Sequence, residues 1–162
     1  MFQIRLATLA DLRRIVEIYN QAIATGNANA YLKPFTLEER RDWFTTHTPD
    51  SYPIYVCEDD NALVIGYLSL SPYRDRPALA RTAEVSYYVD YGQHGIGSAL
   101  MQYALEDCVR IGKKVLLAIV LEWNAPSIKL LERFGFEKWG TLPDVAEFTG
   151  WLCCHLYYGK KV

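Results

Sequence analysis

The chain has 162 residues, 51% of them hydrophobic and 22% charged, which suits one globular domain with a core of ordinary size. Its formal net charge of −2 at pH 7 provides no global basic field, and this argues against nucleic acid as the main partner. No apolar stretch approaches the roughly 20 residues of a membrane span, and the N-terminal residues lack the apolar region of a signal peptide.

The four cysteines form neither a metal-binding nor a disulfide pattern. They lie at positions 57, 108, 153 and 154 without Cys-x-x-Cys spacing, and the three histidines are scattered. The run Cys153-Cys154-His155 is expected on a strand, where neighbouring side chains point to opposite faces, so at most two of the three could bind one ion. We therefore expect buried, reduced cysteines, no metal, and a cytoplasmic protein.

Up to residue 89 the pattern predicts four strands and two helices. Apolar residues at helical spacing follow Thr8, and a second helix follows Thr36; each threonine begins a capping-box pattern, with Asp11 and Glu39 three residues later. The strands are expected at 2–6, 52–57, 63–70 and 83–89, with loops at 27–34 and 71–81.

The second half predicts two more helices and three more strands. Helices are expected at 96–111 and 124–134, each ended by a glycine, and strands at 115–120, 136–139 and 151–158, the last two around a loop at 142–150. Together the elements predict an α+β fold, a single domain over 1–162 with a mixed central sheet flanked by helices.

A glycine-rich turn, Gly92-Gln-His-Gly-Ile-Gly-Ser98, joins a predicted strand to a predicted helix. Such a junction directs free backbone N–H groups and the positive end of a helix dipole at one point, which suits a phosphate or pyrophosphate. The spacing is that of neither a dinucleotide-binding turn, because Leu100 replaces the third glycine, nor a P-loop. A plain tight turn is the alternative interpretation.

A second motif lies downstream: Asn124-x-x-Ser127, an amphipathic helix, and then Gly135-Phe136. Together with the glycine-rich turn it resembles the GNAT N-acetyltransferase superfamily over nearly the whole chain. The segments 18–23, 38–44, 71–78 and 81–89 are similar to its phosphinothricin N-acetyltransferase branch. The resemblance implies the GNAT acyl-CoA N-acyltransferase fold, acetyl-CoA as cosubstrate, acetylation of a small amino-acid-like amine, and a homodimer.

The resemblance also implies a set of cofactor-binding residues. The backbone at Tyr88 and Val89 is expected to hold the pantetheine arm and acetyl carbonyl, the turn to bind the pyrophosphate, and Asn124 to bind the pantetheine near the sulfur. The implied set is Tyr88, Val89, Gln93, His94, Gly95, Ile96, Gly97, Ser98, Asn124 and Ser127.

Glu84 is the candidate general base, because a carboxylate among apolar strand residues is either paired or functional. The alternative is a structural ion pair with an arginine such as Arg81. Arg74 and Arg76 suit a substrate carboxylate or phosphinate, or are solvated. Tyr31 and Phe35 are candidate walls of the amine site, with packing as the alternative.

Departures from the family pattern keep other functions open. Gly92 stands where Gln or Arg is usual, Leu131 replaces a Tyr or His that could protonate the thiolate, and Trp151-Leu152-Cys153 lacks an expected acid. The first alternative is a non-catalytic acyl-CoA-binding or sensor domain of the same fold. The second is an acetyltransferase for a protein or peptide amine.

Overall fold

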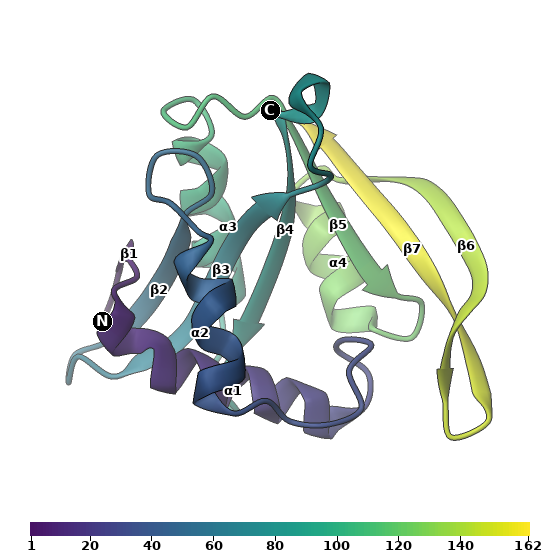
Figure 1. Ribbon diagram of the computed structural model, residues 1–162, viewed down its shortest axis with the longest axis horizontal. Helices are drawn as coiled ribbons and strands as arrows, with labels where there is room; N and C mark the ends of the chain where they lie inside the picture. The colour runs from purple at the N-terminus through teal and green to yellow at the C-terminus, as the bar shows by residue number, and fades with distance from the viewer.

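The computed structural model describes residues 1–162 and contains one seven-stranded sheet in the order β1-β2-β3-β4-β5-β7-β6 (Figure 1). Every neighbouring pair is antiparallel except β4 and β5, which run parallel, so the sheet is mixed as predicted. The strands are β1 Phe2–Leu6, β2 Ile54–Asp59, β3 Val64–Pro72, β4 Thr82–Val89, β5 Val115–Leu121, β6 Glu137–Phe148 and β7 Trp151–Lys161.

Local sequence signals account for the two N-terminal helices. Helix α1 (Leu12–Thr25) follows a short 3-10 turn, in which the Thr8 N–H donates to Asp11 at 2.7 Å. Helix α2 (Leu37–Thr45) begins with the predicted capping box: the Thr36 N–H donates to Glu39 at 2.7 Å, and the Glu39 N–H donates back to Thr36 Oγ1 at 3.3 Å. The predicted start after Thr36 is confirmed, whereas the α-helix predicted after Thr8 begins three residues late, at Leu12, because Leu9–Asp11 form the 3-10 turn.

The four helices cover the two faces of the sheet (Figure 1). Helices α3 (Ile96–Asp107) and α4 (Ala125–Arg133) pack on one face, over a core that includes Val85 and Leu116. Helix α1, with α2 beside it, packs on the other face, against residues such as Tyr67. The side chains of β4 alternate between the two faces as predicted. Ala83 and Val85 are buried in the core under α3 and α4, and Glu84 faces a cavity on the α1–α2 side.

Several predicted boundaries differ from the structure, and the two largest differences are at the ends of α3 and β6. Helix α3 ends at Asp107 rather than Ile111, because the Cys108 N–H bonds to Leu105 three residues back and the chain tightens into turns. The expected loop 142–150 is mostly strand: β6 and β7 form a long hairpin whose turn is only Thr149-Gly150, both at positive φ. Register shifts and exposure along β6 remove the alternation that marks a half-buried strand.

No helix in the structure has the length and apolar character needed to cross a membrane. The four cysteines are free, and three of them, Cys57, Cys108 and Cys153, are buried.

Gly159 in β7 gives a stability prediction for the hairpin. A Cβ at this position would lie 2.1 Å from Cε3 of Trp139 on β6, so the indole must move away. Since Trp139 is half exposed and can turn outward, we expect Gly159→Ala to lower the free energy of unfolding by about 1–3 kcal/mol in urea denaturation. Gly140→Ala on β6, where a Cβ meets open space, is the matched control and should change it by less than about 0.5 kcal/mol.

Candidate active site

Strands β4 and β5 separate from each other partway along their length. They pair only over Thr82–Glu84 with Val115–Leu117, after which β5 continues beside β7 while β4 stays with β3. Figure 1 shows the two strands converging at one end and opening toward the other. The gap lies between the C-terminal ends of β4 and β5, which are the strands that lead into α3 and α4.

The opening exposes backbone hydrogen-bonding groups of β4. The Asp90 N–H donates to Ile65 of the β3 edge at 2.9 Å. Because successive residues of a strand direct their backbone groups to alternate sides, the backbones of Val89 and Tyr87 face the opening, and that of Tyr88 faces β3. The backbone of Val89 therefore faces the opening, whereas Tyr88 directs its backbone toward β3 and lines the opening with its side chain.

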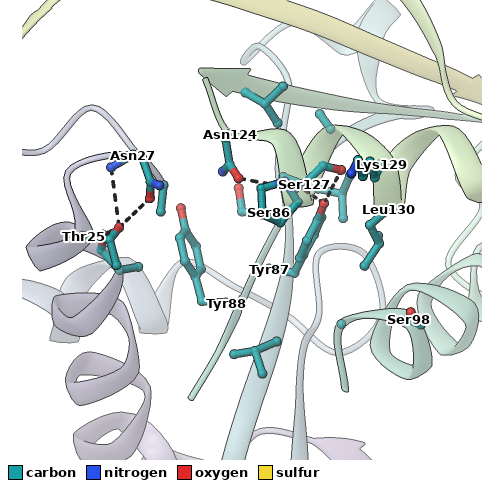
Figure 2. Close-up of a pocket in the computed structure, with 18 of the residues that line it drawn as sticks. Thr25, Asn27, Ser86, Tyr87, Tyr88, Ser98, Asn124, Ser127, Lys129 and Leu130 are labelled. Atoms are coloured by element: carbon teal, nitrogen blue, oxygen red, sulfur yellow. Dashed lines mark hydrogen bonds between the residues drawn. The ribbon is translucent and has the colours of Figure 1, made fainter. Parts of the chain in front are cut away.

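A cavity of about 520 Å³, here called the α3 cleft, occupies this opening. Its walls come from β4, β5, the first turn of α3, one side of α4 and the end of α1 (Figure 2). Eight of the predicted cofactor-binding residues line it: Tyr88, Val89, Gln93, Gly95, Gly97, Ser98, Asn124 and Ser127. His94 and Ile96 do not, because His94 is exposed on the turn and the Ile96 side chain is buried in the core.

The first turn of α3 presents free N–H groups to the cleft. The first bond of the helix joins the Ala99 N–H to Gly95 O at 3.1 Å, so the N–H groups of residues 94–98 donate to no other backbone group. His94 and Ile96 can thus contribute through the backbone alone. Gly95 has φ +78°, a left-handed conformation that favours glycine, and a Cβ on Gly97 would lie 3.2 Å from Leu130.

Two basic residues of α4 also line the cleft, and the sequence reasoning missed both. Lys129 and Arg133 are four residues apart, hence on one side of the helix, and Arg133 Nη2 donates to Ser98 Oγ across the mouth of the cleft. Their spacing, one helical turn apart beside a predicted anion site, is the signal that could have identified them. They add positive charge where the α3 N–H groups point.

Asn124 and Ser127 are connected to β4 by hydrogen bonds (Figure 2). Asn124 caps α4, its Oδ1 accepting the Ser127 N–H at 3.3 Å, and the Ser127 hydroxyl lies 2.6 Å from the Tyr87 hydroxyl. Burial raises the pKa of Tyr87 to about 12, so this phenol stays protonated at neutral pH. The cap uses the amide oxygen of Asn124 and leaves its amide nitrogen available to a ligand.

A second cavity, of about 460 Å³ and here called the Glu84 cavity, lies on the α1–α2 side of the sheet. It shares Ala28, Ser86, Tyr88 and Ile119 with the α3 cleft, so the two cavities meet at the opening between β4 and β5. Two molecules bound one in each cavity would therefore meet beside Ser86 and Tyr88.

Glu84 lines this second cavity without a partner. It forms no ion pair, with Arg81 or any other cation, and its carboxyl group makes no side-chain hydrogen bond. Burial raises the pKa of Glu84 above its ordinary value, and the nearby positive charge of Arg74 opposes that rise. A partly buried carboxyl group with a raised pKa in a cavity is suited to proton transfer.

The other predicted substrate residues divide between the cavity and the surface. Tyr31 lines the Glu84 cavity, and Phe35 packs behind it against Tyr19, with ring centroids 5.8 Å apart. Arg74 and Arg76 are exposed and line neither cavity; each Nη1 donates to the carbonyl of the preceding residue, at 3.1 and 2.8 Å. Arg74 nevertheless lies near enough to Glu84 for its charge to oppose the rise in the pKa of that carboxyl group.

The sequence reasoning missed several residues of the Glu84 cavity, among them Arg40, Tyr67, His155 and Tyr157. Arg40 belongs to the polar helix α2 and shares its inner face with Trp43, three residues later. That spacing is a sequence signal for an inward-facing arginine. No local pattern marks the other three, which reach the cavity from β3 and β7.

Comparison with known proteins agrees with this architecture. Residues 13–136 match the model of the Acetyltransferase (GNAT) family. The chain is 42% identical over 149 residues to YwnH of Bacillus subtilis, covering 91% of each chain. It is 38% identical over 152 residues to an L-methionine sulfoximine/L-methionine sulfone acetyltransferase of Pseudomonas aeruginosa, covering 92% of this chain and 88% of the relative.

A solved structure agrees equally well. The GNAT superfamily phosphinothricin acetyltransferase of Sinorhizobium meliloti, in complex with AcCoA, superposes with a TM-score of 0.92 at 29% identity, covering 99% of this chain and 88% of that one. The predicted family and fold are therefore confirmed, and the chain belongs to the acetyltransferase (GNAT) family.

Proposed function

We propose that this protein transfers the acetyl group of acetyl-CoA to the amino group of a small amino-acid-like acceptor. One observation carries the proposal: the α3 cleft and the Glu84 cavity meet at Ser86 and Tyr88, with an unpaired carboxyl group beside the junction. The substrate named for the Pseudomonas aeruginosa relative, methionine sulfoximine or methionine sulfone, supports the acceptor class.

The residues of the α3 cleft fit acetyl-CoA. The free N–H groups of residues 94–98, with Lys129 and Arg133, suit the phosphates. The backbones of Tyr87 and Val89 and the amide nitrogen of Asn124 suit the amides of the pantetheine arm. When bound, acetyl-CoA supplies the acetyl group as a reactive thioester.

Glu84 is proposed to act as the general base for direct transfer in a ternary complex. The acceptor enters as an ammonium ion, gives one proton to the Glu84 carboxylate, directly or through a water, and attacks the acetyl carbon with its nitrogen. The new C–N bond would replace the C–S bond, and the second proton that the nitrogen loses would pass to the departing thiolate, so that coenzyme A leaves as the free thiol. The α-amino group of a free amino acid is mostly an ammonium ion near neutral pH, so the transfer needs a base, and burial brings the pKa of Glu84 closer to that of the amine.

Two alternatives remain: a domain that binds acyl-CoA without releasing a thiol, and an acetyltransferase whose acceptor is a protein or peptide amine. Leu131 is fully buried in the core and offers no proton to a thiolate, which is the observation behind a non-catalytic acyl-CoA-binding domain. The unpaired Glu84 in its own cavity favours catalysis instead. An acetyltransferase for protein or peptide amines would use the same donor and differ only in the acceptor.

Thiol release from acetyl-CoA, measured across a panel of amines, tests the proposal. We expect free amino acids of the methionine sulfone, methionine sulfoximine and phosphinothricin type to accelerate release, and polyamines and peptides to do so weakly. Acetyl-CoA binding without acceleration by any amine would favour the binding domain. Acceleration by peptides alone would favour the protein acetyltransferase.

We also propose a homodimer that works in the cytoplasm. Exposed apolar side chains on the β6–β7 hairpin, among them Trp151 and Leu152, support an interface between copies. Four free cysteines, three of them buried, support a reducing compartment.

A further inference from the structure

Arg40 is a buried cation without an anionic partner. Its side chain comes from α2 and lines the Glu84 cavity, yet the residue is only 8% exposed. It forms no ion pair, and its Nε makes no hydrogen bond. Because a buried charge without a counter-ion is costly, its persistence here calls for a compensating group.

Aromatic rings hold the Arg40 guanidinium but do not neutralise it. Its central carbon lies 4.0 Å from the ring centre of Trp43, 4.5 Å from that of Tyr19 and 5.3 Å from that of Phe35. Rings bind a guanidinium through its flat face, whereas its N–H groups point outward in its own plane. The aromatic contacts therefore fix the group and leave its donors free for an anion in the cavity.

The Tyr67 hydroxyl is a second unpartnered donor in the same cavity. Tyr67 is fully buried, and its hydroxyl makes no hydrogen bond. Burial raises its pKa well above the ordinary value and keeps the phenol protonated, although the charge of the neighbouring Arg40 opposes the rise. Two buried donors beside each other, both without an acceptor, match the two oxygens of a carboxylate.

We propose that Arg40, assisted by Tyr67, binds the carboxylate of the acceptor and so restricts this enzyme to free amino acids. The inference rests on the proposed acetyltransferase function and adds the recognition of the acceptor to it. Glu84 lines the same cavity and is not paired with Arg40, so both side chains stay available to the acceptor. An α-amino acid carries its amine and its carboxylate on one carbon, so Glu84 can take the proton of the amine while Arg40 binds the carboxylate. Arg74 and Arg76 do not line the cavity, and each donates to the carbonyl of the preceding residue.

Two acceptors that differ only in the carboxylate test this assignment. Methionine sulfone and its carboxamide carry the same side chain and amine, and their kcat/KM values are compared in the parent protein and in Arg40→Gln. We expect Arg40→Gln to lower kcat/KM for methionine sulfone about 30- to 100-fold and for the carboxamide less than about 3-fold. Arg41→Gln is the matched control, because Arg41 is exposed and pairs only with Glu38 at 3.8 Å; it should change neither value.

Tyr67→Phe is the second variant, since it removes one hydroxyl and keeps the buried ring. We expect it to lower kcat/KM for methionine sulfone about 5- to 10-fold and to spare the carboxamide. If both variants lost kcat/KM equally for methionine sulfone and for its carboxamide, the assignment would be overturned and Arg40 would have a structural role. Acetylation of neither acceptor by the parent protein would instead overturn the proposed function, and the assignment with it. Acetyl-CoA affinity, unchanged in both variants, shows that they are folded.

Discussion

Replacing Glu84 with glutamine is expected to lower kcat/KM at neutral pH about 10²- to 10⁴-fold and to leave acetyl-CoA affinity unchanged. The variant keeps the shape of the side chain and removes the only carboxylate among the residues that line its cavity. Burial raises the pKa of Glu84, so in the parent protein the carboxylate forms at higher pH than a solvated glutamate would.

The pH dependence separates a base from a structural residue. In the parent protein kcat/KM should rise with pH as Glu84 ionises and the acceptor amine becomes neutral. In Glu84→Gln only the amine ionisation remains, so the part of the pH profile that belongs to Glu84 should disappear while the part that belongs to the amine stays. The measurement is kcat/KM between about pH 5 and pH 10.

Glu106→Gln provides the control for the loss of one negative charge, because Glu106 is exposed on α3 and bonds only to Gln102. It should leave both the rate and its pH profile unchanged. A pH profile of Glu84→Gln identical in shape to that of the parent would remove Glu84 as the base.

Gly97→Val should weaken acetyl-CoA binding more than about 100-fold while the protein stays folded. Gly97 is the second residue of α3, and the cleft reaches its backbone only because no side chain covers it. A Cβ there lies 3.2 Å from Leu130 and 3.7 Å from Val89, both of which line the cleft, so the added methyl groups would take up space in the cleft beside the free N–H groups. Isothermal titration calorimetry with acetyl-CoA measures the loss.

Ala99→Val is the matched control, since it adds a β-branched side chain to the same helical turn at a position outside the cleft. It should bind acetyl-CoA with unchanged affinity. The close contact with Leu130 is expected to cost Gly97→Val about 1–2 kcal/mol of stability, which urea denaturation checks. Full acetyl-CoA affinity in a folded Gly97→Val protein would show that the first turn of α3 does not hold the pyrophosphate.

Short-range signals explain why much of the fold could be predicted. The capping residues at Thr36 and Glu39 act within one turn, and the alternation of β4 follows from the period of a strand. The β6–β7 hairpin was not predicted, because β6 is mostly exposed and contains register shifts, so its sequence lacks the alternation of apolar and polar residues. The end of α3 was overestimated, since the apolar pattern continues into the turns that follow.

The two halves of the candidate site differ in how far the sequence reveals them. The turn at 92–98 and the motif at 124–127 indicated a candidate anion site and the family from the sequence, because each is local and depends on backbone geometry. Residues of the Glu84 cavity come from α2, β3, β4 and β7, which lie far apart in the chain. The spacing of Arg40 and Trp43 indicates an inward-facing arginine, but only the neighbours in space show that its charge has no ionic partner.

The sequence by itself thus determined the family and the mixed sheet, and it indicated the turn proposed for a phosphate-bearing donor, because these rest on period, caps and glycines within short segments. Only the tertiary structure decided that Arg40 and Tyr67 share a cavity with Glu84 and that Arg74 and Arg76 do not. How deeply a charged side chain is buried, and whether it has an ionic partner, are properties of the folded chain. The physical reason is that a charge is functional or solvated according to what surrounds it, and its surroundings come from distant parts of the sequence.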